Sequence, residues 1–279
     1  MRLGAALRQA QDRLEREGIP DPWLEAQVLF SEVLGRTRAQ LLAQPERALA
    51  PGEIQGLDHL LHRRLRREPT AYILGRRDFY GRDFSVDPRV LIPRPETELL
   101  VEGALGRVRE LPEEPLLAEV GTGSGAIAIT LALELPQARV YALDISTAAL
   151  EVARINCRRY GVEGRVELLQ GDLLSPLPQP VHMVIANLPY IPQATRLPPE
   201  VSHEPSLALC GGPDGLALFR AFLAQAGPWL LPGGYILLEI GAGQAEAVME
   251  LVAGYFPQAE RRLLPDLAGL PRVVEIDLN

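Results

Sequence analysis

The chain has 279 residues, of which 47% are hydrophobic and 23% charged; this is typical of a globular protein with room for two domains. Its net charge of −8 argues against a general nucleic-acid binder, because such proteins neutralise phosphates with basic side chains. The acidic excess falls in residues 76–279, with 17 Arg against 26 Asp and Glu. Residues 1–75 are nearly neutral, with 11 Arg against 10 acidic residues.

The sequence also limits where the protein acts. No apolar run is long enough to cross a membrane, and the N-terminus lacks the apolar core of a signal peptide. Cys157 and Cys210 match no metal or disulfide spacing, so we expect two buried, inert thiols. We therefore expect a cytoplasmic protein with no metal, no membrane partner and no direct nucleic-acid partner.

The first 75 residues predict a small helical bundle, which we take as an N-terminal domain. Leu3, Leu7 and Leu14 share one helix face, and proline and glycine residues from 18 to 22 end that helix. Further helices are predicted over Trp23–Leu34, closed by Gly35, over Arg38–Ala43 with Thr37 as N-cap, and from Pro51 towards Arg67.

A basic cluster lies near the end of the last of these helices. It consists of Arg63, Arg64, Arg66 and Arg67. One interpretation is a solvated helix end, where cations favour the helix dipole. The other is a patch that meets an acidic or phosphate-bearing partner.

Residues 76–98 predict a β-hairpin and linker. Tyr72–Gly75 followed by Arg77–Val86 alternates around a glycine like a hairpin. Two prolines then make Leu91–Glu98 extended, ahead of an apolar helix over Leu99–Val108. We interpret this linker as a hinge that also lines a site.

Strands and helices alternate from Leu116, which predicts a doubly wound, Rossmann-like α/β fold over residues 99–279. The expected strands are Leu116–Val120, Arg139–Leu143, Arg165–Gln170, Val181–Ala186, Tyr235–Ile240, Arg261–Leu264 and Arg272–Leu278. The expected helices are Ala126–Leu135, Thr147–Tyr160, Leu216–Leu230 and Gln244–Tyr255.

A glycine-rich turn joins the first strand to its helix and predicts a cofactor site. Its glycines allow a tight turn and close ligand approach at a helix N-terminus. Asp144, at the end of the second strand, is placed to accept both hydroxyls of a ribose, and this spacing also fits a dinucleotide fingerprint. Asp172 and Leu173, after the third strand, are placed to reach an adenine. The predicted cofactor residues are Glu119, Gly121, Thr122, Gly123, Ser124, Gly125, Asp144, Asp172, Leu173 and Asn187.

The sequence Asn187-Leu188-Pro189-Tyr190 follows the fourth strand and suits a small planar amino group. The Asn187 side-chain oxygen and the Leu188 carbonyl can accept its N–H bonds, and Tyr190 can cover its flat face. Pro189 restricts Leu188 to an extended conformation and so holds that carbonyl in one direction. Dinucleotide enzymes have no need of this sequence, whereas amino-group methyltransferases that use S-adenosylmethionine do.

With these motifs, the chain resembles the release-factor glutamine methyltransferases, the HemK/PrmC family of class I methyltransferases. The specific segments are Leu91–Glu98, His203–Leu209 and Gly211–Gly215. The resemblance implies S-adenosylmethionine as cofactor, S-adenosylhomocysteine as product, and N5-methylation of the glutamine in the Gly-Gly-Gln motif of class 1 peptide release factors. It implies Asn187, Leu188, Pro189 and Tyr190 as the catalytic and substrate-binding residues.

The resemblance adds Arg94 to the substrate site and a substrate-recognition role for the helical domain, in an expected monomer. One position departs from the family pattern Asn-Pro-Pro-Tyr, because Leu188 replaces the first proline. Asn-Leu-Pro-Tyr is similar to the motif of rRNA adenine dimethyltransferases. This similarity leaves a nucleic-acid adenine or guanine N-methyltransferase as the first alternative. The glycine loop and Asp144 leave two others, a dinucleotide oxidoreductase and a non-catalytic cofactor-binding module.

Overall fold

The computed structural model describes residues 1–278 and divides into two compact units. One unit is Met1–Arg76 together with Leu197–His203, and the other is Arg77–Arg196 with the residues from Glu204 onward. The segment Leu197–His203 lies inside the predicted 99–279 domain in sequence, yet it packs within the helical unit. In the described part of the chain, no helix is both long and apolar enough to cross a membrane.

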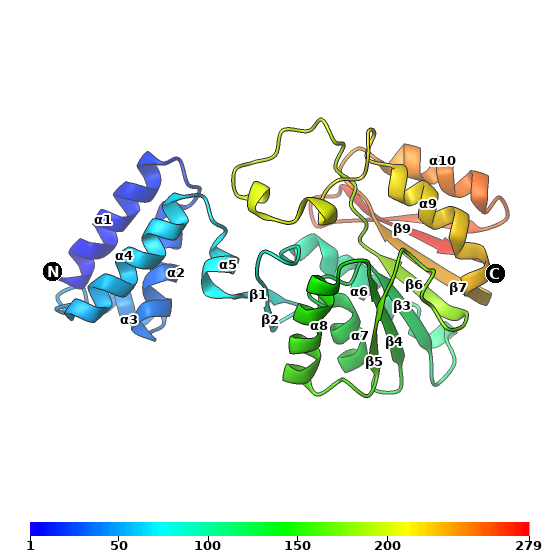
Figure 1. The fold of residues 1–279 in the computed structure, drawn as a ribbon, viewed down its shortest axis with the longest axis horizontal. Coiled ribbons are helices and arrows are strands. Elements are labelled where there is room, and N and C mark those ends of the chain that lie inside the picture. Colours follow the sequence, from blue (N-terminus) through cyan, green and yellow to red (C-terminus); the bar gives the residue numbers. More distant parts are fainter. Residues whose placement is uncertain (279) are drawn as a thin grey trace. The chain divides into compact units, whose positions relative to one another are not determined.

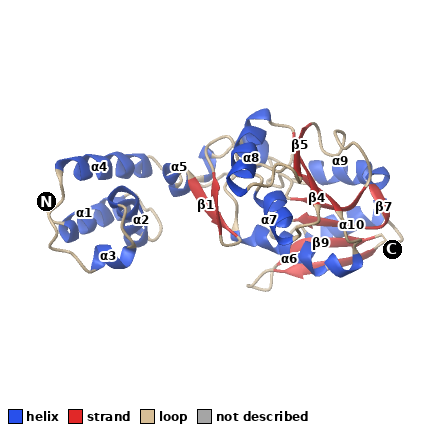
Figure 2. Cartoon of the chain, turned by 90° about the horizontal axis from the view of Figure 1, so that it is seen from below, coloured by secondary structure: helices blue, strands red, loops and turns tan. Residues whose placement is uncertain are grey.

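The first unit is built from helices and loops (Figure 2). A capping box holds the start of α3, where the Thr37 side chain accepts from the Gln40 N–H and the Gln40 side chain accepts from the Thr37 N–H. Gly35 adopts a left-handed conformation that ends α2, as its position predicted. The helices are α1 (Leu3–Arg16), α2 (Pro22–Leu34), α3 (Arg38–Leu42), α4 (Pro51–Leu65) and α5 (Thr70–Leu74).

The prediction that Tyr72–Gly75 belongs to the hairpin is wrong, because these residues end helix α5. Pro69 stands at the N-cap of that helix, and Gly75, with φ of 69°, closes it in a left-handed conformation. Tyr72 and Ile73 are buried by this turn of helix. Burial of two apolar side chains outweighs the β-propensity of a run this short.

In the basic cluster at the end of α4, Arg63, Arg64 and Arg67 are paired with acidic side chains, whereas Arg66 is exposed. Arg64 is only 4% exposed, and its guanidinium donates to Glu25 at 3.1 Å and to Glu200 at 3.3 Å. Arg67 donates to the same Glu200 oxygen at 3.0 Å, and Arg63 donates to Glu68 at 2.9 Å. Through Glu200, Arg64 and Arg67 therefore tie the segment Leu197–His203 to the helices of this unit.

The predicted hairpin is confirmed as β1 (Arg76–Phe79) and β2 (Arg82–Ser85), with Tyr80 and Gly81 at the turn. Phe79 and Phe84 are fully buried and meet edge to face, with ring centroids 6.1 Å apart. The hairpin thus packs through its aromatic residues.

The second unit contains a seven-stranded sheet of order β5-β4-β3-β6-β7-β9-β8. The first five of these strands run parallel, and β9 runs antiparallel to both of its neighbours, β7 and β8. This arrangement confirms the predicted α/β fold. The chain reverses its direction of winding between β3 and β6, where such sheets bind ligands. The strands are β3 (Leu116–Val120), β4 (Arg139–Asp144), β5 (Val166–Gln170), β6 (Val181–Ala186), β7 (Leu230–Glu239), β8 (Glu260–Pro265) and β9 (Pro271–Asp277).

Helices cover both faces of this sheet and bury alternate strand residues (Figure 1). One face packs against α6 (Glu98–Gly106), α7 (Ala126–Glu134) and Cys157 of α8 (Thr147–Tyr160). The other packs against α9 (Ala217–Ala226) and α10 (Ala245–Tyr255). Cys157 is buried as predicted, but Cys210 is exposed, because it lies in a loop after the short helical turn Ser206–Ala208.

Candidate active site

A crevice of about 170 Å³ opens at the carboxyl ends of the parallel strands. It brings together eight of the predicted site residues from four separate strand ends. These are Gly121, Gly123, Asp144, Asp172, Leu173, Asn187, Leu188 and Pro189. The lining also includes Leu91, from the linker expected to line a site, and Pro205 and Leu207, from one of the family-specific segments. Arg89, Ile145 and Ser146 line the crevice as well, and no sequence motif had singled them out.

The glycine loop after β3 turns with three left-handed glycines, at φ of 77° for Gly121, 55° for Gly123 and 81° for Gly125. L side chains rarely adopt this conformation, so the turn requires glycine. The Gly121 N–H donates to the Leu143 carbonyl at 2.8 Å, which pins the loop to β4. Gly125 stands directly before α7, so the loop leads into a helix N-terminus.

Asp144, at the end of β4, is held by the backbone on both oxygens. Oδ2 accepts from the Gly123 N–H and Oδ1 from the Ser146 N–H, each at 2.9 Å. Burial raises the pKa of Asp144, and these backbone hydrogen bonds oppose the rise. A carboxylate has about four acceptor sites, so lone pairs remain for ligand hydroxyls in the crevice.

Glu119 lies beneath the glycine loop and outside the lining of the crevice. It is 2% exposed and accepts from the Thr122 hydroxyl at 2.6 Å and from the Ala128 N–H at 2.9 Å. Burial raises its pKa to about 8. Here Glu119 shapes the loop, while Thr122, Ser124 and Gly125 lie at its buried side; direct contact of these four with a cofactor stays a prediction.

Asp172 and Leu173 lie beyond β5, where the backbone is strained. Leu173 has φ of 48°, which is uncommon for a residue with a side chain, and it is 8% exposed. Such conformations collect at ligand sites, where the surrounding structure holds them. The strained backbone keeps the Leu173 side chain in the crevice wall beside the exposed Asp172 carboxylate.

The Asn187–Tyr190 segment begins directly after β6. Asn187 Nδ2 donates to Thr97 Oγ1 at 3.2 Å, and Leu188 is 2% exposed. Within residues 1–278, no hydrogen bond is made to the Leu188 carbonyl oxygen. Tyr190 is half-buried outside the crevice lining, and burial raises its pKa to about 12. It therefore stays a neutral phenol.

Residues 209–215 hold the backbone of this segment from the side. Ile191 N–H donates to the Leu209 carbonyl at 3.0 Å, and Gly211 N–H donates back to the Ile191 carbonyl at 2.9 Å. A Cβ on Gly211 would lie 2.6 Å from the Pro189 oxygen, and one on Gly215 would clash with the Tyr190 oxygen. Only glycine allows this close approach.

Arg94 and Ile92 of the linker both contact Glu204, the residue that follows the segment Leu197–His203. The Arg94 guanidinium forms an ion pair with Glu204, whose other oxygen accepts from the Ile92 N–H at 3.0 Å. The Glu204 side chain is only 2% exposed. Arg94 does not line the crevice, so its predicted role in binding substrate remains a prediction, and its contact here is structural.

Three supporting residues were not predicted individually from the sequence: Asn156, Thr97 and Glu239. Asn156 is fully buried and donates to the Ser124 carbonyl at 2.8 Å and the Ser85 carbonyl at 3.0 Å, which joins the hairpin to the glycine loop. Thr97 lies beside Asn187, and Glu239 ends the neighbouring strand β7. Asn156 and Glu239 could have been found as candidate buried polar residues, because each interrupts an apolar pattern in the sequence.

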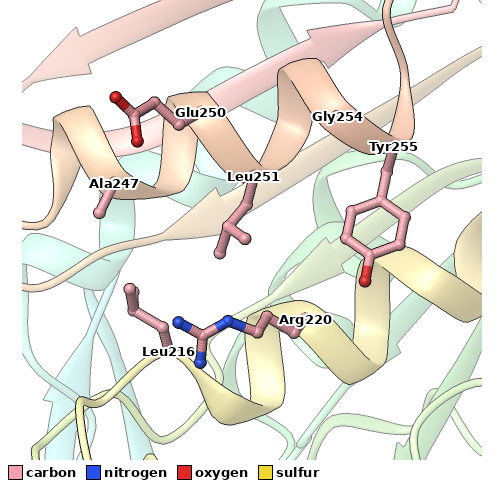
Figure 3. Close-up of a pocket in the computed structure, with 7 residues that line it drawn as sticks. All are labelled: Leu216, Arg220, Ala247, Glu250, Leu251, Gly254 and Tyr255. Carbon is pink, nitrogen blue, oxygen red and sulfur yellow. The ribbon is translucent and has the colours of Figure 1, made fainter.

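A second, larger hollow of about 510 Å³ lies between α9 and α10 (Figure 3). It contains none of the predicted site residues, and the Arg220 guanidinium within it is paired with Asp214 at 2.6 Å. Nothing in its lining combines polar groups with strand ends as the crevice does.

Comparison with known proteins identifies the family. Residues 5–75 match the model described as the PrmC N-terminal domain, and residues 98–202 match the methyltransferase small domain. The release factor glutamine methyltransferase of Moorella thermoacetica is 46% identical over 275 residues, covering 98% of this chain and 97% of that protein.

Solved structures are similar as well. A release factor-specific protein-(glutamine-N5) methyltransferase from Alicyclobacillus acidocaldarius shares 32% identity over 70% of this chain and 98% of its own, with a TM-score of 0.44. A methyltransferase from Pyrococcus furiosus, 16% identical, shares the fold, with a TM-score of 0.53 over 72% of this chain and 91% of its own. From its identity to the Moorella protein across nearly the whole of both chains, this chain belongs to the release factor glutamine methyltransferase family, as its motifs predicted.

Proposed function

We propose that this protein transfers a methyl group from S-adenosylmethionine to the side-chain amide nitrogen, N5, of the glutamine in the Gly-Gly-Gln motif of class 1 peptide release factors. The observation that carries the proposal is that Asn187, Leu188 and Pro189 line the same crevice as the glycine loop and Asp144. The names of the relatives agree with this substrate.

The residues of the crevice fit S-adenosylmethionine. Asp144 would bind the ribose hydroxyls, Asp172 and Leu173 would meet the adenine, and the backbone of Gly121 and Gly123 would approach the cofactor closely. When bound, the cofactor supplies a methyl group already activated by the positive charge on sulfur.

The protein's part is to position a weak nucleophile. An amide nitrogen is a poor nucleophile because its lone pair is delocalised into the carbonyl. The Asn187 side-chain oxygen and the Leu188 carbonyl would accept the two N–H bonds of the substrate amide and aim its nitrogen. These hydrogen bonds strengthen as positive charge develops on that nitrogen, which lowers the barrier. No strong base is needed, since the methylated nitrogen becomes acidic.

We assign recognition of the release factor to the helical unit. Arg64 and Arg67 are paired with glutamates of the same unit, so recognition would use surface other than these two side chains. The chain runs from the segment Leu197–His203 of this unit directly into Glu204 and Pro205 of the other, which is a second covalent link besides the hairpin linker.

Mass spectrometry of a purified release factor, incubated with the protein and S-adenosylmethionine, tests the proposal. We expect the mass of one methyl group on the peptide that contains Gly-Gly-Gln, and none when that glutamine is replaced. The matched control is the Asn187→Ala protein, which should leave the peptide unmodified in the same time. Methylation of RNA or DNA with no change in the release factor would favour the nucleic-acid alternative.

A further inference from the structure

Glu239 lies next to Asn187 because of the strand register. Strands β6 and β7 run parallel with Ala186 opposite Leu238, so the next residues of both strands, Asn187 and Glu239, emerge side by side. Thr97, at the end of the short helical turn Pro95–Thr97, completes the group. Glu239 is 3% and Thr97 5% exposed, so both polar side chains are withdrawn from solvent.

The hydrogen bonds of this group have one consistent direction. Asn187 Nδ2 donates to Thr97 Oγ1 at 3.2 Å, and the Thr97 and Asn187 side chains lie close enough to the Glu239 carboxyl group to lower its pKa through hydrogen bonding. An ionised carboxylate only accepts, so the Thr97 hydroxyl hydrogen is directed to Glu239 and a Thr97 lone pair remains for Asn187. The reverse orientation would set the Asn187 amide oxygen against a negative carboxylate.

Glu239 is also an unusual residue for its position. Its Oε2 is buried and has no hydrogen-bond partner within residues 1–278. The strand residues before it, Leu237 and Leu238, are fully buried and apolar. A buried carboxylate with an unsatisfied oxygen costs folding free energy, and such groups in native proteins call for a functional explanation.

We propose that Glu239 and Thr97 are positioning residues that fix the orientation of the Asn187 amide, so that its oxygen faces the substrate and its nitrogen faces the protein. The proposal rests on the function proposed above. Only this orientation lets the Asn187 side chain accept an N–H of the glutamine amide, beside the Leu188 carbonyl. Rotated by half a turn, Asn187 would present its NH₂ group to the substrate's NH₂ group, and no hydrogen bond would form.

The protonation state of Glu239 then controls the orientation. Burial raises its pKa to about 7; hydrogen bonds from Thr97 and Asn187 and the charge of Arg272 lower it, and Glu96 raises it. The Tyr190 phenol also faces this carboxylate. A protonated Glu239 can donate to Thr97, which frees the Thr97 hydroxyl to donate to the Asn187 oxygen. The active form is therefore the carboxylate, and methyl transfer should weaken as pH falls through about 7.

Single-turnover methylation of a release factor at saturating S-adenosylmethionine tests the proposal. Thr97→Val removes the hydroxyl at nearly constant volume and should slow transfer about 10- to 100-fold. Thr97→Ser keeps the hydroxyl and should retain the parent rate to within a few-fold. Thr130→Val is the matched control and should change nothing, because Thr130 is a fully buried threonine of α7 whose Oγ1, unlike that of Thr97, has no hydrogen-bond partner among the described residues. Equal rates for Thr97→Val and the parent would overturn the proposal.

The Asn187 amide itself gives a readout that does not depend on turnover. Its side-chain NH₂ resonances, identified by their absence from Asn187→Asp, should shift with a midpoint near pH 7 in the parent. The shift should vanish in Glu239→Gln, and the rate of that variant should lose its dependence on pH. Resonances that do not titrate, or that titrate unchanged in Glu239→Gln, would overturn this inference. A parent protein that fails to methylate any release factor would instead overturn the proposed function.

Discussion

Asp144 offers a direct test of the cofactor site. Replacing it with alanine removes the charge-assisted hydrogen bonds that a carboxylate makes to ribose hydroxyls, which we expect to weaken binding by about 1.5–3 kcal/mol. That is a rise of about 10- to 150-fold in the Kd for S-adenosylmethionine, measurable by titration calorimetry.

The structure also shows how the substitution could act indirectly. Asp144 accepts from the Gly123 and Ser146 N–H groups at 2.9 Å, so Asp144→Ala also leaves the glycine loop without an anchor. A cofactor analogue without the ribose hydroxyls separates the two effects. If Asp144 binds those hydroxyls, the analogue should bind the parent and Asp144→Ala about equally.

Two results would refute the reasoning about Asp144. The first is an equal loss of affinity for the cofactor and for its deoxy analogue, which would assign the whole effect to the loop. The second is an unchanged Kd for S-adenosylmethionine together with tight binding of NAD, which would favour the dinucleotide alternative.

Further predictions concern the substrate segment and the helical unit. Asn187→Ala should slow single-turnover methyl transfer by ~10²–10³, as loss of a preorganised polar contact does. A rate equal to the parent's would disprove that Asn187 orients the substrate amide. Leu188→Pro should be tolerated in the same assay because it keeps the carbonyl; loss of activity on release factors would strengthen the resemblance to the adenine enzymes. Gly211→Ala should lower the free energy of unfolding by about 1–3 kcal/mol in chemical denaturation, since its Cβ would lie 2.6 Å from the Pro189 oxygen; unchanged stability would mean that the backbone yields there. Arg64→Met should also lower the free energy of unfolding by about 1–3 kcal/mol, because Glu25 and Glu200 lose their partner. Both glutamates are partly exposed, so the destabilisation should be smaller than for a fully buried ion pair. An unchanged denaturation curve would contradict the role of Arg64 in holding the segment that contains Glu200.

The sequence determined the elements that depend on local patterns. The alternation of apolar strands and helices from Leu116 predicted the α/β fold, and Gly35 and Thr37 predicted where two helices end and begin. The eight predicted residues found at the crevice come from the carboxyl ends of strands or from the loops that follow them. Parallel strands bring such loops to one edge by geometry, so the order of motifs along the chain was sufficient.

The tertiary structure alone decided what depends on contacts between distant segments. Whether Arg64 was solvated could not be read from its neighbours, because its partners Glu25 and Glu200 are 39 and 136 residues away in sequence. Tyr72–Gly75 has an ambiguous local pattern, and burial settled it as helix. Glu239 and Thr97 lie 142 residues apart in the chain, and only the register of β6 with β7 and the packing of the Pro95–Thr97 turn bring them both to Asn187. Local pattern fixes secondary structure through backbone periodicity, whereas the partners of a buried polar group are fixed by whichever strands and turns the folded core places around it.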